Sequence, residues 1–203
     1  MTKLTFPESE RAFVLEKYRS ADVILEYGSG GSTIFAAEQP GKYIMSVESD
    51  RDWAINIQAE IDQADLPSDV IVHHVDIGEI GLWGRPVDAQ GWAKYHHYPL
   101  NIWTQPFFRQ PDLVLIDGRL RPACLVATCL RAKKKVTVLF DDYANRPAYH
   151  VVEKLVKPVR YVGRIAEFEI TPNIWPNWAE DFLHELCTKV TFSVGTVSYQ
   201  ASL

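Results

Sequence analysis

Short, almost continuously apolar runs separated by helix-like segments constrain the fold of this chain more than any other feature. Strands buried on both faces of a parallel sheet have this continuous pattern, whereas half-exposed strands alternate. Two weaker runs follow in the last quarter of the chain. In order, the runs are 23–26, 43–47, 70–75, 113–116, 136–140, 160–164 and 168–171.

Helix-like segments lie between these runs, at 8–18, 52–64, 122–131 and 147–156. In the second of them Trp53, Ile57 and Ile61 recur every four residues, which predicts one buried face. Residues 49–52 before it have the form of a capping box. Strands that alternate with helices predict right-handed βαβ units and a doubly wound α/β sheet. We expect residues 1–203 to form one such domain.

One segment, 78–111, breaks this rhythm. It is rich in tryptophan, tyrosine, phenylalanine and histidine, and it is longer than an ordinary loop in a compact domain. Its aromatic content excludes disorder. Three interpretations remain open: a lid over a substrate, a hydrophobic cover for the sheet, or a contact between copies in a homo-oligomer.

The composition limits which partners and which cellular compartment we expect for this protein. A net charge of −5 over 203 residues argues against a nucleic-acid partner, which needs clustered lysine and arginine. The first ten residues lack the apolar stretch of a signal peptide, and no run is long enough to span a membrane. Three cysteines without metal-like spacing favour a reducing compartment. We therefore expect a cytoplasmic protein with a small-molecule partner.

A glycine-rich turn, E-Y-G-S-G-G-S-T at 26–33, follows the first apolar run. Its glycines allow a close approach of a ligand to the backbone, and the helix after it offers free N–H groups. A dinucleotide or S-adenosylmethionine could use such a turn, and a connection without a ligand is the third alternative. A dinucleotide fingerprint needs a glycine where Thr33 stands. Glu26 would repel a pyrophosphate but attract a sulfonium, so the turn favours S-adenosylmethionine.

The segment from Glu26 to Gly30 resembles the first motif of the class I S-adenosylmethionine-dependent methyltransferases. Later acids fit that family too, since Glu48, Asp76 and Asp117 end the second, third and fourth runs. The resemblance implies that Glu48 binds the ribose hydroxyls and that Asp76 reaches the adenine amino group. The cofactor-binding residues that it implies are Glu26, Gly28, Ser29, Gly30, Ser32, Thr33, Glu48, Ser49, Asp76 and Asp117.

The resemblance covers residues 23 to about 142 and implies the Rossmann-like fold of that family. Its sheet has seven strands in the order 3-2-1-4-5-7-6, with the seventh antiparallel. The weaker runs after residue 160 supply candidates for the last strands, and 191–199 is a good candidate for the seventh.

Three carboxylates, Asp117, Asp141 and Asp142, follow neighbouring strands and should meet at the carboxyl edge of the sheet. Converging carboxylates suit Mg²⁺. The pattern resembles the metal-dependent O-methyltransferases of the catechol and macrocin types, which implies that these three acids bind Mg²⁺ and that Asp117 and Asp142 are catalytic. Arg119 and Arg121 depart from that pattern: they could neutralise the acids or receive an acidic acceptor.

A histidine pair, His96-His97, lies in the aromatic segment. A neutral imidazole can take a proton from an acceptor hydroxyl, so His97 is the third catalytic candidate. The alternative is that His96 and His97 are surface residues with no catalytic role.

These observations predict an S-adenosylmethionine-dependent methyltransferase that acts on the oxygen of a small hydroxylated molecule or a saccharide, with Mg²⁺ as a second cofactor. The main alternative is a binding or scaffolding protein that keeps the fold without catalysis. A nicotinamide-dependent oxidoreductase is disfavoured by Thr33 and Glu26.

Overall fold

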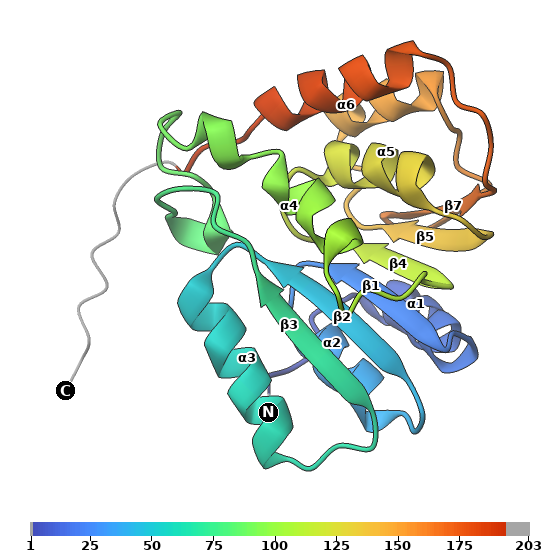
Figure 1. The fold of residues 1–203 in the computed structure, drawn as a ribbon. Helices are drawn as coiled ribbons and strands as arrows, with labels where there is room; N and C mark the ends of the chain where they lie inside the picture. The colour runs from blue at the N-terminus through green and yellow to red at the C-terminus, as the bar shows by residue number, and fades with distance from the viewer. Residues whose placement is uncertain (1, 194–203) are drawn as a thin grey trace.

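A seven-stranded sheet in the order β3-β2-β1-β4-β5-β7-β6 forms the centre of the protein in a computed structural model, which describes residues 2–193 (Figure 1). The first five strands pair in parallel, and β7 is antiparallel to β5 and β6. The strand order implied by the resemblance is confirmed. The strands are β1 (Val23–Tyr27), β2 (Tyr43–Glu48), β3 (Asp69–His74), β4 (Leu113–Ile116), β5 (Val136–Phe140), β6 (Arg160–Val162) and β7 (Ile165–Ile170).

The seventh strand of the sheet is β7, so the assignment of 191–199 to that position is wrong. A two-residue turn joins β6 to β7, and Gly163 adopts the positive φ of 55° that this turn requires. Both final strands therefore come from the two weaker runs, with β7 beginning earlier than predicted. Residues 191–193 belong to no strand, and 194–199 lie outside the described residues.

Helices cover both faces of the sheet (Figure 1). Since successive residues of a strand point to opposite faces, Ile24 and Ile44 pack with α1 and α2, whereas Leu25 and Met45 pack with α5 and α6. No helix within residues 2–193 is long and apolar enough to cross a membrane. The helices are α1 (Glu8–Ser20), α2 (Gly31–Glu38), α3 (Arg51–Gln63), α4 (His97–Leu100), α5 (Arg121–Arg131) and α6 (Trp178–Thr188), with 3-10 helices η1 (Leu82–Gly84), η2 (Trp92–Lys94), η3 (Asn101–Thr104) and η4 (Pro147–Lys154).

The start of α3 differs from the prediction in its cap, which is Asp50 alone rather than a capping box over 49–52, and in one side chain. Asp50 caps the helix by accepting a hydrogen bond from the Trp53 N–H, and Ile57 and Ile61 are buried as predicted. Trp53 is 39% exposed instead of buried. Its indole N–H donates to the carbonyl oxygen of Ser29 at 2.8 Å, so Trp53 contacts the glycine-rich turn.

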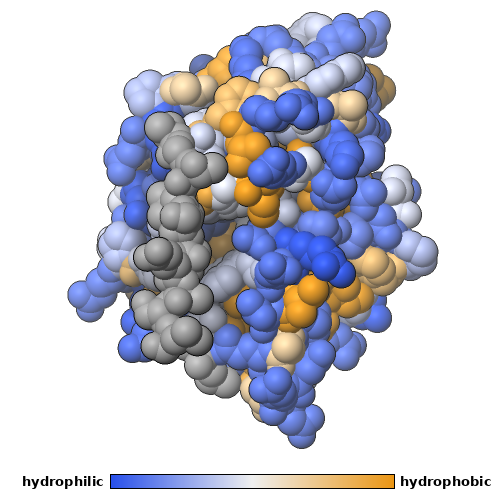
Figure 2. All heavy atoms as spheres, turned by 90° about the vertical axis from the view of Figure 1, so that its left-hand side faces the viewer, coloured by the Kyte–Doolittle hydropathy of each residue, from blue (hydrophilic) through white to orange (hydrophobic). Residues whose placement is uncertain are grey.

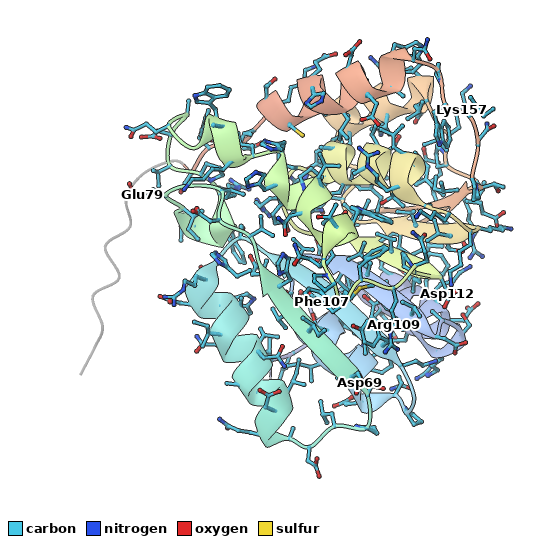
Figure 3. The ribbon with its side chains drawn as sticks, in the orientation of Figure 1. Asp69, Glu79, Phe107, Arg109, Asp112 and Lys157 are labelled. Atoms are coloured by element: carbon cyan, nitrogen blue, oxygen red, sulfur yellow. The ribbon has the colours of Figure 1, made fainter. Side chains whose placement is uncertain are left out.

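The aromatic segment 78–111 has two parts. It runs from Glu79, beyond the carboxyl ends of the parallel strands, to the face of β2 and β3, where Phe107 and Arg109 lie (Figure 3). Tyr95 and Tyr98 of its middle are buried and belong to the main core. The early part is exposed instead, with large hydrophobic side chains in solvent. Its exposed tryptophans are Trp83 and Trp92. The segment therefore covers the sheet with its second part, and only its first part is placed as a lid would be.

Candidate functional site

Two turns touch where β1 and β4 end. Gly28 has a φ of 102°, and a Cβ there would lie 2.8 Å from the Cα of Gly118. The hydroxyl of Tyr98 accepts a hydrogen bond from the Arg119 N–H at 3.2 Å and donates to the Val47 carbonyl oxygen at 3.3 Å. Tyr98 thus joins the ends of β2 and β4 beneath the glycine-rich turn.

Replacing Gly118 with alanine is expected to destabilise the protein by about 1–3 kcal/mol, the usual cost of overpacking. The new Cβ would lie 2.1 Å from the Tyr98 hydroxyl oxygen and 2.8 Å from the backbone nitrogen of Gly28. Urea unfolding measures the change. Gly30→Ala is the matched control, because a Cβ there meets no atom within 4 Å and the backbone of Gly30 is extended, with a φ of 171°. An equal loss in both variants would contradict the close contact of the two turns.

Glu26 lies under the turn rather than on it. It is fully buried, and its carboxylate accepts hydrogen bonds from the Tyr18 hydroxyl at 2.5 Å and from the Thr33 hydroxyl. Burial raises the pKa of Glu26, while these hydrogen bonds lower it. Thr33 also accepts from the Gly30 N–H at 3.0 Å. Glu26 and Thr33 therefore fix the turn from its buried side, and the Glu26 carboxylate, at 0% exposure, presents no surface to a ligand.

Glu48 links the turn to the start of α3. Its Oε2 accepts from the Ser29 N–H at 3.1 Å, and its Oε1 accepts from the N–H groups of Ser49 and Asp50 at 2.7 and 3.0 Å. The side chain is 9% exposed. The Ser49 hydroxyl donates to the carbonyl oxygen of Gly84 at 3.1 Å, so the exposed part of the aromatic segment borders this carboxylate.

The side of the glycine-rich turn at Gly30 is open to solvent. A Cβ at Gly30 would meet no atom within 4 Å. The Ser29 hydroxyl shares a hydrogen bond with Ser46 at 2.7 Å, whereas Ser32 is buried at the start of α2. The turn therefore presents its backbone at Gly30 to the open space beside it.

Asp76 follows β3 at the same edge of the sheet. Its side chain is 57% exposed, and it forms a 2.6 Å ion pair with Lys94 of the aromatic segment. The hydrogen bond from Lys94 lowers the pKa of Asp76, helped by the Gly78 N–H. Asp76 is thus accessible, at the expected end of its strand, and in contact with the segment placed as a lid.

Three aspartates after β4 and β5 form what we call the acid cluster: Asp117, Asp141 and Asp142. Arg121 reaches all three, with Asp117 at 2.9 Å, Asp142 at 3.1 Å and Asp141 at 3.7 Å. Arg164 holds Asp141 through two hydrogen bonds of 2.8 and 3.0 Å. A further guanidinium, that of Arg146, lies 2.8 Å from Asp142.

Asp117 has a strongly shifted pKa. Burial raises its pKa to about 7, and the neighbouring negative charges of Asp141 and Asp142 act in the same direction. The positive charge of Arg121 opposes the increase. Its side chain keeps 36% exposure. A carboxylate of this kind can exchange a proton near neutral pH and is reachable from solvent.

The acid cluster does not fit Mg²⁺, contrary to the expectation from the metal-dependent relatives. Both oxygens of Asp141 are bound by Arg164, and Arg121 or Arg146 pairs with the other two carboxylates. Guanidiniums within the cluster already supply the positive charge that a cation would bring. Over residues 2–193, no group of three or more His, Cys, Asp or Glu side chains is arranged to hold a metal ion.

His97 begins α4, and its ring lies edge-on to His96 with 4.2 Å between the centroids. Burial lowers the pKa of His96, and the imidazoles of His97 and His184 add to this. In the described part of the chain, no hydrogen bond or ion pair joins His97 to the acid cluster. The role of His97 as a catalytic residue therefore stays a prediction.

Sequence reasoning missed three residues that organise this edge of the sheet: Tyr98, Trp53 and Arg164. From the sequence, Tyr98 and Trp53 are interpreted as ordinary apolar residues, because their spacing in the sequence does not predict a polar contact with a distant turn. Arg164 ended a weak strand in the sequence. Only the pairing of β7 beside β5 brings it to Asp141.

Comparison with solved structures decides the family. A methyltransferase-like protein from Silicibacter pomeroyi DSS-3 is 42% identical, with 92% of this chain and 97% of that chain aligned at a TM-score of 0.88. The chain belongs to the class I methyltransferase family. No protein-family model and no curated protein matched its sequence.

Two more distant methyltransferases share the fold at low identity. An O-methyltransferase from Bacillus cereus in complex with SAH is 15% identical, covering 81% of this chain and 80% of its own, at a TM-score of 0.51. A SAM-dependent O-methyltransferase from Thermotoga maritima is 11% identical, covering 87% and 69%, at a TM-score of 0.53. At these identities the comparison concerns the fold alone.

Proposed function

We propose that this methyltransferase uses S-adenosylmethionine to methylate a hydroxyl oxygen of a small molecule or a saccharide. The observation that carries the proposal is the junction of the Gly28 turn with Glu48. There an open glycine turn and a carboxylate at the end of β2 are joined by the Ser29 N–H. Two solved structures that share the fold are named O-methyltransferases, and one of them is in complex with SAH.

The residues at the turn fit S-adenosylmethionine. The open side at Gly30 leaves space for the ligand beside the backbone. We assign the ribose hydroxyls to Glu48, because its carboxylate accepts from the Ser29 N–H of the turn. Asp76 is accessible for the adenine amino group. Glu26 would act from beneath, by fixing the turn and by its negative charge.

The acceptor hydroxyl must lose a proton as its oxygen attacks. S-adenosylmethionine supplies the methyl group on a sulfonium and leaves as S-adenosylhomocysteine when the S–C bond breaks. Asp117 is the proposed proton acceptor, because its pKa near 7 suits a base at neutral pH. Arg121 and Arg146 hold Asp142 beside it, so Asp142 is a positioning residue in this scheme.

Saturating S-adenosylhomocysteine is expected to raise the melting temperature of the wild-type protein, and Glu48→Ala is expected to abolish that increase. Two charge-assisted hydrogen bonds to the ribose would be lost, which corresponds to a drop in affinity of about a hundredfold. Asp69→Ala is the control: it removes an exposed carboxylate at the opposite end of β3 (Figure 3). No increase in the wild type, or an equal one in both variants, would reject the proposed site.

A binding protein without catalysis is the second candidate. The observation in its favour is the pairing of every aspartate of the acid cluster with an arginine, which is also what a purely structural ion-pair network looks like. It would bind S-adenosylhomocysteine without methylating any acceptor. The Asp117→Asn experiment described in the Discussion separates the two candidates.

A further inference from the structure

A cavity of about 170 Å³ lies next to the acid cluster, at the carboxyl edge of the sheet. Gly118 and the residues after it form one wall, η4 and the end of α6 form others, and the aromatic segment closes it through Arg85 and Pro86. Hydrophilic residues predominate on this side of the molecule, around smaller hydrophobic areas (Figure 2). Because Gly118 also touches the Gly28 turn, the cavity adjoins the proposed cofactor site.

The charged residues that line this cavity are all basic. Among the described residues 2–193 that line it, none is an aspartate or a glutamate. Five basic residues do line it: Arg85, Arg119, Arg121, Arg146 and Lys189.

Three of these cations already have carboxylate partners. Arg121 and Arg146 pair with the acid cluster, and Lys189 pairs with Glu185. The guanidiniums of Arg85 and Arg119 have no carboxylate or hydrogen-bond partner within residues 2–193, and the Nε of Arg85 is buried.

Leaving the buried Nε of Arg85 unsatisfied is costly, and placing positive charges together adds to the cost. Burial lowers the pKa of Arg119, and the charges of Arg121 and Arg85 contribute to that decrease. These guanidiniums are therefore close enough to repel one another. Guanidiniums stay protonated in proteins, so an anion is what would relieve both the repulsion and the missing hydrogen bonds.

The volume limits the ligand. A cavity of roughly 150 Å³ accommodates a molecule of the size of benzene. The present cavity therefore suits one small ring or a short chain that carries an acidic group. A carboxylate or phosphate can accept paired hydrogen bonds from a guanidinium.

We propose that this cavity binds the acidic group of the methyl acceptor, which is a small hydroxylated carboxylic acid or phosphate ester held by Arg85 and Arg119. This rests on the proposed function, because it assigns the acceptor's place beside Asp117. The acceptor's anion neutralises the two unpaired guanidiniums, and its hydroxyl remains at the side of the acid cluster.

The test compares an anionic ligand with a neutral one of nearly the same shape, and adds inorganic phosphate as a second anion. Isothermal titration of the wild-type protein with 3-hydroxybenzoate, 3-hydroxybenzamide and inorganic phosphate is expected to show binding of the two anions and at least about tenfold weaker binding of the neutral amide. Binding of phosphate but not of 3-hydroxybenzoate would support the same site with a phosphate ester as acceptor. Equal affinity for the acid and the amide, or no binding of either anion at millimolar concentration, would overturn the proposal.

Variants locate the anion. Arg85→Gln with Arg119→Gln is expected to weaken anion binding at least about tenfold, whereas Arg131→Gln, an exposed arginine paired with Glu180, leaves it unchanged. Undiminished binding in the double variant would also overturn the proposal. The double variant should keep the S-adenosylhomocysteine shift in melting temperature. In the wild type, a melting-temperature shift with S-adenosylhomocysteine but no anion binding would reject this cavity alone. Anion binding without that shift would reject the cofactor site alone.

Discussion

Replacing Arg164 with leucine is expected to lower the free energy of unfolding by about 3 kcal/mol. The change leaves Asp141 without its bidentate partner, and the Asp141 side chain is only 2% exposed. Removing one member of a buried ion pair costs about 3–5 kcal/mol because the other charge stays buried. The lower end of that range applies since Arg121 remains 3.7 Å from Asp141. Chemical denaturation with a linear extrapolation measures the loss.

A surface pair provides the matched control for this result. Arg131 lies 3.3 Å from Glu180, and both side chains are at least 42% exposed. Arg131→Leu should therefore cost less than about 1 kcal/mol. Adding Asp141→Asn to Arg164→Leu should recover part of the loss, because the stranded charge is removed. Equal stability of the Arg164 and Arg131 variants would show that Asp141 does not depend on Arg164.

Replacing Asp117 with asparagine is expected to lower kcat/KM by a factor of about 10²–10⁴, the usual contribution of a general base. The measurement is S-adenosylhomocysteine production with an acceptor that the wild-type protein methylates. Asp112→Asn is the control, since Asp112 precedes β4 while Asp117 follows it (Figure 3). An active Asp117 variant would contradict the role of base, and a wild type that binds cofactor without turnover would favour the binding protein.

The same carboxyl makes activity and stability depend on pH in opposite directions. Activity needs the deprotonated form, so kcat/KM of the wild type should increase through pH 7. In the folded protein the pKa of Asp117 is raised from 3.8 to about 7, so between these values the folded state binds more protons than the unfolded state. Its contribution to stability is therefore present below pH 3.8 and is lost as the pH rises through 7. Asp117→Asn should remove this dependence.

The parallel half of the sheet could be predicted from the sequence because β1, β2, β4 and β5 are almost entirely buried on both faces, and only the edge strand β3 is partly exposed. Their apolar runs are continuous, and each ends near an acid or a glycine that marks the carboxyl edge. The antiparallel end was harder to predict. In β7, Glu167 and Glu169 interrupt the apolar residues, since Glu167 pairs with Lys17 and Arg160 and Glu169 with Lys135. Such pairs depend on neighbours that the sequence does not reveal.

Positions at the candidate site could be predicted better than the contacts there. Glu48, Asp76 and Asp117 all lie at the ends of their strands, since a strand boundary follows from local pattern. Which arginine pairs with which aspartate depends on the tertiary structure. The arginines that pair with Asp117 and Asp142 come from α5 and the start of η4, and their distances decide against a metal. Local spacing carries no information about them.

The buried position of Glu26 has a consequence for the motions of the protein. Its carboxylate joins Tyr18 of α1 to Thr33 of α2, on either side of the glycine turn. Neither helix can detach without leaving a buried polar group without its partner, so α1, the turn and the start of α2 should open together as one cooperative unit. A ligand that holds the turn would thereby also protect α1, a helix that it never touches.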